Sequence, residues 1–255
     1  MRAGKLMKLD SWMSFHSTIN RMMEYPLPAT TLSKKDCERI MSPAITQLLH
    51  SLGICKNFPG TLVFTPLDYF GLSIKHIHTM QEIQHIETMI NNTMSENFTG
   101  TLYRATLEAL IVEVGIGVNV LNAPYEQLEH LTTDSIIKTT WEFMDNNQIT
   151  IQHDITIPEI RVNDSTIMQA MIKIGAQGEV LRTINKCRIF LKVYFLSDIY
   201  NSKGAHILPW VLQGRPGPAA NGCRWQRQGQ IQGKDWEEWR SYFSKLQASN
   251  AFYHR

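Results

Sequence analysis

Few residues in this chain combine a reactive side chain with a spacing that suits catalysis. Glu82 and His85 have the Glu-x-x-His spacing found in carboxylate-bridged di-metal helices. Such a site needs partner carboxylates and a second copy of the motif, and no second copy occurs, so His76, His78 and His85 are expected at the surface or the core edge. Asp198 is a lone carboxylate after an apolar segment, which favours a turn or cap over a metal ligand.

Recognisable catalytic motifs are missing from the sequence. No two Asp residues are adjacent, and there is no Ser nucleophile elbow, Walker loop or Gly-x-Gly-x-x-Gly turn. Two-metal phosphoryl transfer needs several convergent carboxylates, and no second motif accompanies Asp198. The sequence therefore predicts no catalytic residue, no metal and no cofactor, and it favours a protein that is not an enzyme.

The segment that follows Glu179 is the best candidate for binding. On a wheel of 100° per residue its basic face spans an arc of about 160°, with apolar side chains opposite. Arg182, Lys186, Arg188 and Lys192 would contact phosphates on this face, and such binding would weaken with salt because counterions are released. The alternative is a solvated face that pairs with acidic residues in the N-terminal half.

A second basic segment places Trp225 between cations. Its aromatic ring can stack on a base, as in proteins that bind single strands, so Arg224, Trp225 and Arg227 join the candidate nucleic-acid contacts. The alternative is a Trp packed in the core beside surface arginines. Trp236 and Trp239 are spaced to anchor a C-terminal helix onto the body of the protein.

Charge is distributed unevenly along the chain. Residues 1–172 carry 12 Lys and Arg against 18 Asp and Glu, whereas residues 173–227 carry nine against two. Such asymmetry indicates either a polyanionic partner, such as an RNA or DNA backbone, or contact between the two parts of the chain.

Composition indicates a globular protein inside the cell. The 255 residues are 43% hydrophobic and 19% charged, which is enough apolar material for a core. No run of about 18 apolar residues predicts a membrane span, and the N-terminus lacks the apolar core of a secretory signal. Four scattered cysteines without Cys-x-x-Cys spacing favour a reduced intracellular setting, either cytoplasmic or nuclear.

Hydrophobic periodicity predicts a mainly α fold, an irregular multi-helix bundle with two or three short strands. Ser33 should cap a helix that ends at Gly53, with a kink or break at Pro43. Residues 179–195 should form another helix, and a Gly/Pro-rich loop at 213–233 should precede a terminal amphipathic helix. The predicted strands are residues 61–65, 149–157 and 206–212.

We expect four segments along the chain. An N-terminal helix and linker should occupy residues 1–32, and a helical region should occupy residues 33–118. A second helical region with the basic helix should span residues 119–212, followed by a linker and Trp-rich helix at 213–255. Helical spacing predicts that the cores bury Ile40, Leu48, Leu110, Trp141, Phe190 and Leu191, with residues 213–233 outside.

Three stretches resemble retroelement-encoded reverse transcriptases. Residues 52–72 resemble the segment after the catalytic palm, where a helix ends in Gly-Leu or Gly-Ile before an apolar run and a Pro-x-x-x-Gly-Gly-Leu-Gly-Leu turn. Asn185-x-x-Arg188-x-x-Leu191 before Ser197-Asp198-Ile199 resembles a later helix and turn of the same reading frames. The spaced Trp residues resemble their tail, so the likeness covers roughly residues 30–245.

The departures from the family pattern are informative. Phe70 and Ser73 stand where the family has glycines, and if those glycines need a positive φ, Phe70 should be strained. The Tyr/Phe-x-Asp-Asp metal loop and the palm are absent. The resemblance therefore implies the thumb and downstream region of a polymerase without its active site.

Two functions follow as expectations. The resemblance implies a non-catalytic fragment of a retroelement polyprotein that binds nucleic-acid backbone weakly and without sequence preference, with the polymerase portion of the same element as a further partner. The alternative is a helical protein-interaction or scaffold module with no nucleic-acid role. The state of the basic helix face, open or packed, discriminates between them.

Overall fold

A computed structural model describes residues 7–117, 119–153, 155, 157, 164–201, 206–217, 223, 225–226 and 228–248. In this part of the chain every regular element is a helix, and the only strand-like features are two isolated β-bridges. The mainly α prediction is confirmed. The chain divides into two compact units, Met1–Asn91 and Asn92–Arg255, so the boundary falls inside the segment predicted at 33–118.

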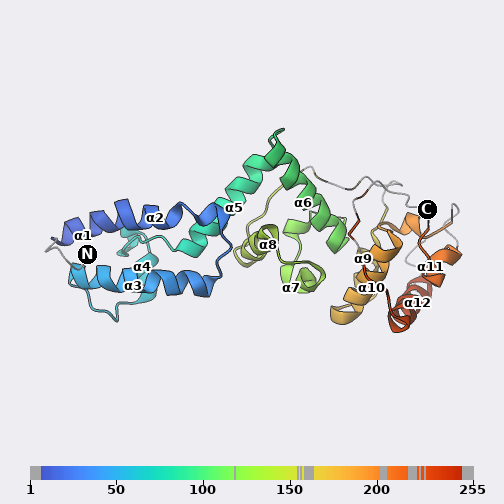
Figure 1. Ribbon diagram of the computed structural model, residues 1–255. Coiled ribbons are helices and arrows are strands. Elements are labelled where there is room, and N and C mark those ends of the chain that lie inside the picture. The colour runs from blue at the N-terminus through green and yellow to red at the C-terminus, as the bar shows by residue number, and fades with distance from the viewer. Residues whose placement is uncertain are drawn as a thin grey trace. The chain divides into compact units, whose positions relative to one another are not determined.

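The first unit is built from two long helical runs. α1 (Lys8–Ser14), a π-helical segment (Phe15–Ile19) and α2 (Asn20–Glu24) follow one another without a break, and α1 lies alongside α3 (Lys34–Leu52) (Figure 1). α4 (Gly60–Phe64) and α5 (Ile77–Thr93) complete the unit. Their shared core buries the following side chains: Phe15, Leu27, Cys37, Met41, Leu48, Val63, Ile74 and Ile77.

Local signals account for the ends of α3. The hydroxyl of Ser33 accepts a hydrogen bond from the Asp36 amide, as the predicted cap requires. Gly53 ends the helix with a φ of 73°, a conformation that glycine adopts without strain. The break expected at Pro43 does not occur. α3 runs continuously through this position, and Pro43 is exposed.

The predicted strand at residues 61–65 is wrong. The run forms α4, a single helical turn that buries Val63. The backbone amides of Leu72 and Ile74 donate to the carbonyls of Leu62 and Val63, and these groups belong to the last turn of the helix. The carbonyls of this β-prone run therefore accept hydrogen bonds from the loop that follows it, and not from a neighbouring strand.

The other two predicted strands are also not confirmed. Residues 149–153 have no regular structure, and residues 154 and 156 lie outside the described residues. In 206–212 only Ile207 makes a β-bridge, to Tyr200, and α11 (Pro209–Gln213) begins two residues later. Proline at the first helical position favours this early helix start.

The second unit is arranged around α10 (Gly178–Leu191). This helix packs against α6 (Phe98–Val114), α9 (Ile167–Lys173) and α12 (Gly233–Ala248), and α11 lies on α12 (Figure 1). α7 (Tyr125–Leu128) and α8 (Ile136–Asn146) pack together in the same unit. Trp239 anchors α12, as predicted, because its ring is fully buried and its Nε1 donates to the Val211 carbonyl at 3.2 Å.

The predicted core is correct in part. Leu48, Leu110, Trp141 and Leu191 are buried, and Phe190 is half-buried against Trp236, whereas Ile40 is 45% exposed. The linker predicted outside the core at 213–233 has no fully buried residue where it is described, although parts of it contact the unit. Gly214 lies under the Trp236 ring and Gly217 under the Trp210 ring, too close for a Cβ at either position.

Gly71 is the tightest point of the first unit, and its replacement tests this packing. A Cβ at this position would overlap the carbonyl oxygen of Thr65. We expect Gly71→Ala to lower the free energy of unfolding by about 2 kcal/mol, in the range of severe steric changes. Gly60→Ala is the matched control, because a Cβ there meets no neighbouring atom. Chemical denaturation that finds the two variants equally stable would contradict this packing.

Candidate functional site

Arg188 of α10 is fully buried, so the predicted basic face is wrong at this position. Its Nη2 donates to the carbonyls of Val112 and Glu113 at 2.6 and 3.1 Å, and its Nη2 and Nε both donate to the Asn185 side-chain oxygen at 2.6 and 3.0 Å. Val112 and Glu113 belong to the last turn of α6. The guanidinium therefore occupies the negative end of the α6 dipole and binds carbonyls that lack helical partners.

Side chains next to Arg188 also donate hydrogen bonds to the backbone at the end of α6. Asn185 donates from its amide nitrogen to the Glu113 carbonyl at 2.8 Å, and the Tyr194 hydroxyl donates to the Ile116 carbonyl at 2.8 Å. Gly115 ends α6 at a φ of 79°, and a Cβ there would lie 2.7 Å from the Arg188 Cζ. A side chain at residue 115 would therefore displace the guanidinium.

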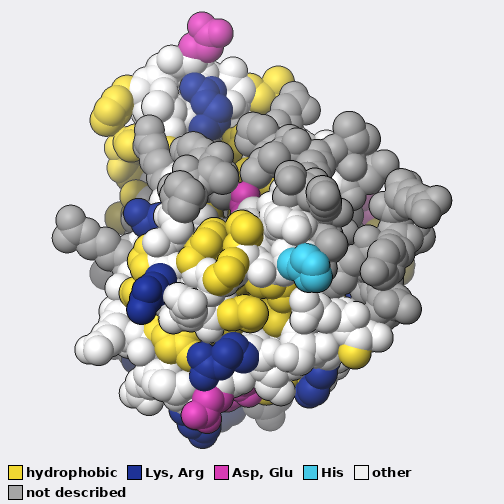
Figure 2. Space-filling view, turned by 90° about the vertical axis from the view of Figure 1, so that its right-hand side faces the viewer, with side chains coloured by type: hydrophobic (Ala, Val, Ile, Leu, Met, Phe, Trp, Pro, Cys, Tyr) yellow, Lys and Arg dark blue, Asp and Glu magenta, His cyan; other side chains and the backbone are white. Residues whose placement is uncertain are grey.

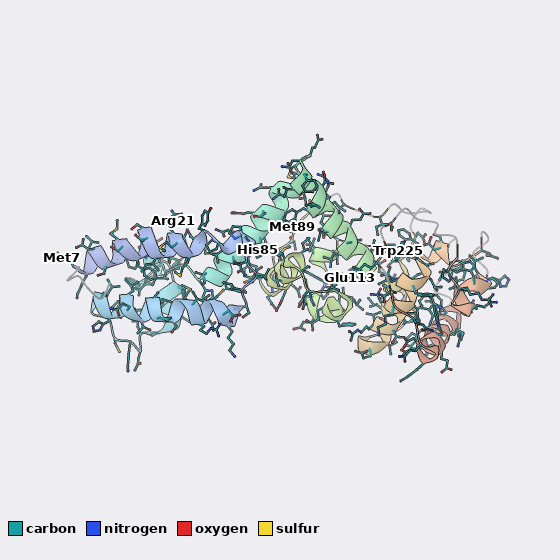
Figure 3. All side chains as sticks on the ribbon, viewed as in Figure 1. Met7, Arg21, His85, Met89, Glu113 and Trp225 are labelled. Atoms are coloured by element: carbon teal, nitrogen blue, oxygen red, sulfur yellow. The ribbon has the colours of Figure 1, made fainter. Side chains whose placement is uncertain are left out.

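Aromatic rings cover the guanidinium where no carboxylate does. Tyr194 and the half-buried Trp225 each place a ring centroid 5.6 Å from the Arg188 Cζ (Glu113 and Trp225 are labelled in Figure 3). No ion pair to Arg188 occurs among the described residues. Burial lowers the pKa of Arg188 to about 10, so the side chain stays charged near neutral pH.

Three of the other predicted nucleic-acid contacts lie on α10 or at its end, where they are exposed or half-buried. Arg182 is exposed and pairs with Glu179 at 3.3 Å, Lys186 is half-buried, and Lys192 ends α10 with a φ of 58°. Arg224 and Arg227 lie outside the described residues. On the face shown in Figure 2, Lys and Arg side chains stand apart with hydrophobic and uncharged atoms between them.

Asp198 serves as a cap, as its position after an apolar helix favours. Its Oδ2 accepts hydrogen bonds from the amides of Tyr194 and Phe195 at 2.7 and 2.9 Å. These bonds hold the turn that leaves α10. A carboxylate committed to two backbone amides has a structural role in this unit.

Glu82 and His85 form a buried polar cluster on α5 in the first unit. The His85 Nδ1 lies 3.7 Å from the Glu82 carboxylate, and the His78 Nε2 lies 3.9 Å from it (His85 is labelled in Figure 3). Gln81 exchanges hydrogen bonds with both backbone groups of Leu32, and the His85 Nε2 contacts the Leu27 carbonyl at 3.2 Å. The cluster fastens α5 to the connection between α2 and α3.

A metal site is not formed by these groups. Within the described ranges, no three His, Cys, Asp or Glu side chains converge in a way that could hold a metal ion. His85 is buried beside the buried Glu82, so its predicted place at the surface or core edge is wrong, whereas His76 and His78 are half-buried. The i, i+3 spacing of Glu82 and His85 instead places the two side chains beside each other inside the core.

The loop at residues 66–72 is a further candidate binding site. Its reactive side chains form no catalytic pattern, so the sequence motifs did not indicate it. Leu67, Tyr69 and Phe70 are 61%, 72% and 93% exposed. Phe70 has a φ of 60°, as expected if the family's glycine adopts a positive φ there, and this conformation costs a bulky residue about 1–2 kcal/mol. A strained and exposed aromatic residue indicates a functional position.

Comparison with known protein families, curated proteins and solved structures finds no match to this chain. Among the described residues, no helix combines the length and apolar character needed to span a bilayer. The resemblance to reverse transcriptases therefore stays a prediction. Function must be inferred from the structure of the two units.

Replacing Arg188 should lower the stability of the fold, whether or not the chain binds nucleic acid. Arg188→Met leaves the Val112 carbonyl and the Asn185 oxygen without their donor, so we expect a loss of about 2 kcal/mol or more in unfolding free energy. The matched variant Arg182→Met removes an exposed pair and should cost less than about 1 kcal/mol. Equal thermal stability of the two variants would contradict the structural role of Arg188.

The Glu82 cluster should make unfolding sensitive to acid. Burial alone would raise the pKa of Glu82, but the nearby His85, the Gln81 amide and His78 outweigh it and lower that pKa below 4.5. The carboxylate therefore stabilises the fold above pH 4.5, and this contribution is lost as the pH falls through the folded-state pKa.

Glu82→Gln tests this dependence. The variant should lose stability less steeply than the wild-type protein between about pH 5 and pH 3, measured by denaturation at each pH. Glu87→Gln removes an exposed carboxylate from the same helix and serves as the control. Identical slopes for Glu82→Gln and the wild-type protein would show that the cluster has no titrating role.

Proposed function

We propose that this chain is a helical protein-interaction module whose contact surface lies on its first unit. One observation carries the proposal. The large hydrophobic side chains that the described residues expose all lie between Met7 and Leu102, and none of the described residues after Leu102 exposes one. Exposed apolar surface of this kind commonly marks a site for a partner.

The helical run α1–α2 provides one such surface in the first unit. Leu9 and Met13 are four residues apart, and Met22 and Tyr25 are three apart, so each pair shares a helical face. Methionine side chains adapt their shape to irregular partners. Such a surface suits a protein groove, because hydrophobic contact needs no fixed charge on the partner.

The resemblance suggests which protein this partner is. A segment downstream of a reverse-transcriptase palm would dock onto the polymerase portion of the same element, so we propose that portion as the partner.

The cysteines support a reducing intracellular location, cytoplasmic or nuclear, because all four are free thiols: Cys37, Cys55, Cys187 and Cys223.

Nucleic-acid binding is the second candidate function. The observation that favours it is the surface position of Arg182 and Lys192, with Lys186 half-buried on the same helix. The burial of Arg188 leaves these cations dispersed, so their binding would be weak and salt-dependent.

Binding to the polymerase portion, prepared as a separate polypeptide, tests the proposal. The double variant Met22→Glu with Tyr25→Glu should weaken binding about tenfold or more, because each change places a charge on exposed apolar surface. Gln127→Glu with Gln213→Glu adds the same charge at exposed polar positions and should leave affinity unchanged.

Salt separates the two candidate functions. Protein docking through apolar side chains should change little between about 50 and 200 mM salt, whereas binding to phosphates should fall steeply. The proposal fails if the chain binds RNA or DNA with a steep salt dependence, loses that binding in Arg182→Gln with Lys186→Gln, and shows no affinity for the polymerase portion.

A further inference from the structure

The loop at residues 66–72 is held rigidly in the first unit. The amides of Phe70 and Gly71 donate to the carbonyls of Leu67 and Pro66 at 3.0 and 3.1 Å. The loop then returns to the α4 segment, where the Ser73 amide donates to the Thr65 carbonyl at 2.8 Å. These bonds keep Phe70 at a positive φ while its ring stays in solvent, so the loop is preorganised to present aromatic side chains.

An open apolar pocket of ≈ 230 Å³ lies between α3 and α4 of the same unit. Its floor is formed by the buried side chains of Met41, Leu49 and Val63, and the half-buried Ile45 and Phe58 line it as well. Small-molecule sites are commonly about 300–1,000 Å³. This pocket is below that range and suits the insertion of one or two side chains.

Charges at the pocket and on the loop are complementary. Lys56 and Glu38 lie at the pocket, together with His76, whose imidazole is close enough to Glu38 for mutual attraction. Lys56 forms no ion pair within the described residues, and Asp68 stands exposed between Leu67 and Tyr69. A loop entering the pocket would therefore bring Asp68 toward an available cation.

We propose that the pocket binds the 66–71 loop of a second copy of this chain. Phe70 is too exposed to occupy the pocket of its own molecule, so loop and pocket are both open in one copy. Tyr69 and Phe70 of each copy enter the pocket of the other, and Asp68 faces Lys56. Reciprocal exchange closes a two-fold dimer and leaves no unmatched loop or pocket.

This pairing explains why Phe70 is present at a strained position. Glycine would fit the backbone there without strain, but it would remove the aromatic anchor. A membrane is a poorer occupant, because Asp68 lies between the side chains that would insert into hydrocarbon. The inference concerns the loop and the pocket alone and does not depend on docking through α1–α2.

Sedimentation velocity over a concentration series of the full chain tests the proposal. The wild-type protein should dimerise, and Phe70→Gly should raise the dissociation constant at least tenfold while melting at the same or a higher temperature. Phe98→Ser removes a comparably exposed aromatic side chain outside the loop and should leave the dimer unchanged. A wild-type protein that stays monomeric, or equal weakening by both variants, would overturn the proposal.

Charge reversal provides a test that leaves the apolar core intact. Asp68→Lys and Lys56→Asp should each weaken the dimer, and the double variant should restore it. Mixing Phe70→Gly, which keeps its pocket, with Lys56→Asp, which keeps its loop, should give more dimer than either variant alone, because the intact loop of one copy then enters the intact pocket of the other. Failure of the double variant to recover self-association would overturn the pairing of Asp68 with Lys56.

Discussion

The second unit depends on the buried guanidinium of Arg188. A charge inside a protein is costly unless hydrogen bonds offset its burial, and here the last carbonyls of α6 and the Asn185 side chain accept from the Nη2 and Nε of Arg188, while its Nη1 has no hydrogen-bond partner among the described residues. The same contact joins α10 to α6 and fixes the place of Gly115, where no side chain fits. Because this cation is committed to helix ends, α10 has a structural role that limits its use as a phosphate-binding surface.

The first unit relies on a different buried polar group. Glu82 and His85 sit inside the core with Gln81, which bonds to the backbone of Leu32 and so ties α5 to the link between α2 and α3. The described residues of this unit expose several large hydrophobic side chains, and its strained Phe70 projects into solvent. Rigid support beneath exposed hydrophobic side chains is the arrangement expected of a docking surface.

Local chemistry explains what could be predicted from the sequence. Ser33 and Gly53 mark helix ends through contacts with their own neighbours, so their roles were readable from the sequence alone. Arg188 was misplaced because its partners Val112 and Glu113 are about 75 residues away, and a helical wheel contains no information about another helix's C-terminus. The strand predicted at 61–65 failed because propensity does not reveal whether a neighbouring strand exists. Phe70 was identifiable only as a departure from a glycine pattern, and its exposure required the fold.

The central claim is that the contact surface lies on the first unit and not on the basic helix α10. Hydroxyl-radical footprinting of the full chain, alone and with saturating RNA or DNA, tests it most directly. The account predicts rapid labelling of Met7, Met22 and Tyr25, slow labelling of the buried Met144 and Met171, and no change in either set when nucleic acid is added. Slow labelling of the N-terminal side chains, or strong protection around Trp225 and α10 by nucleic acid, would contradict it.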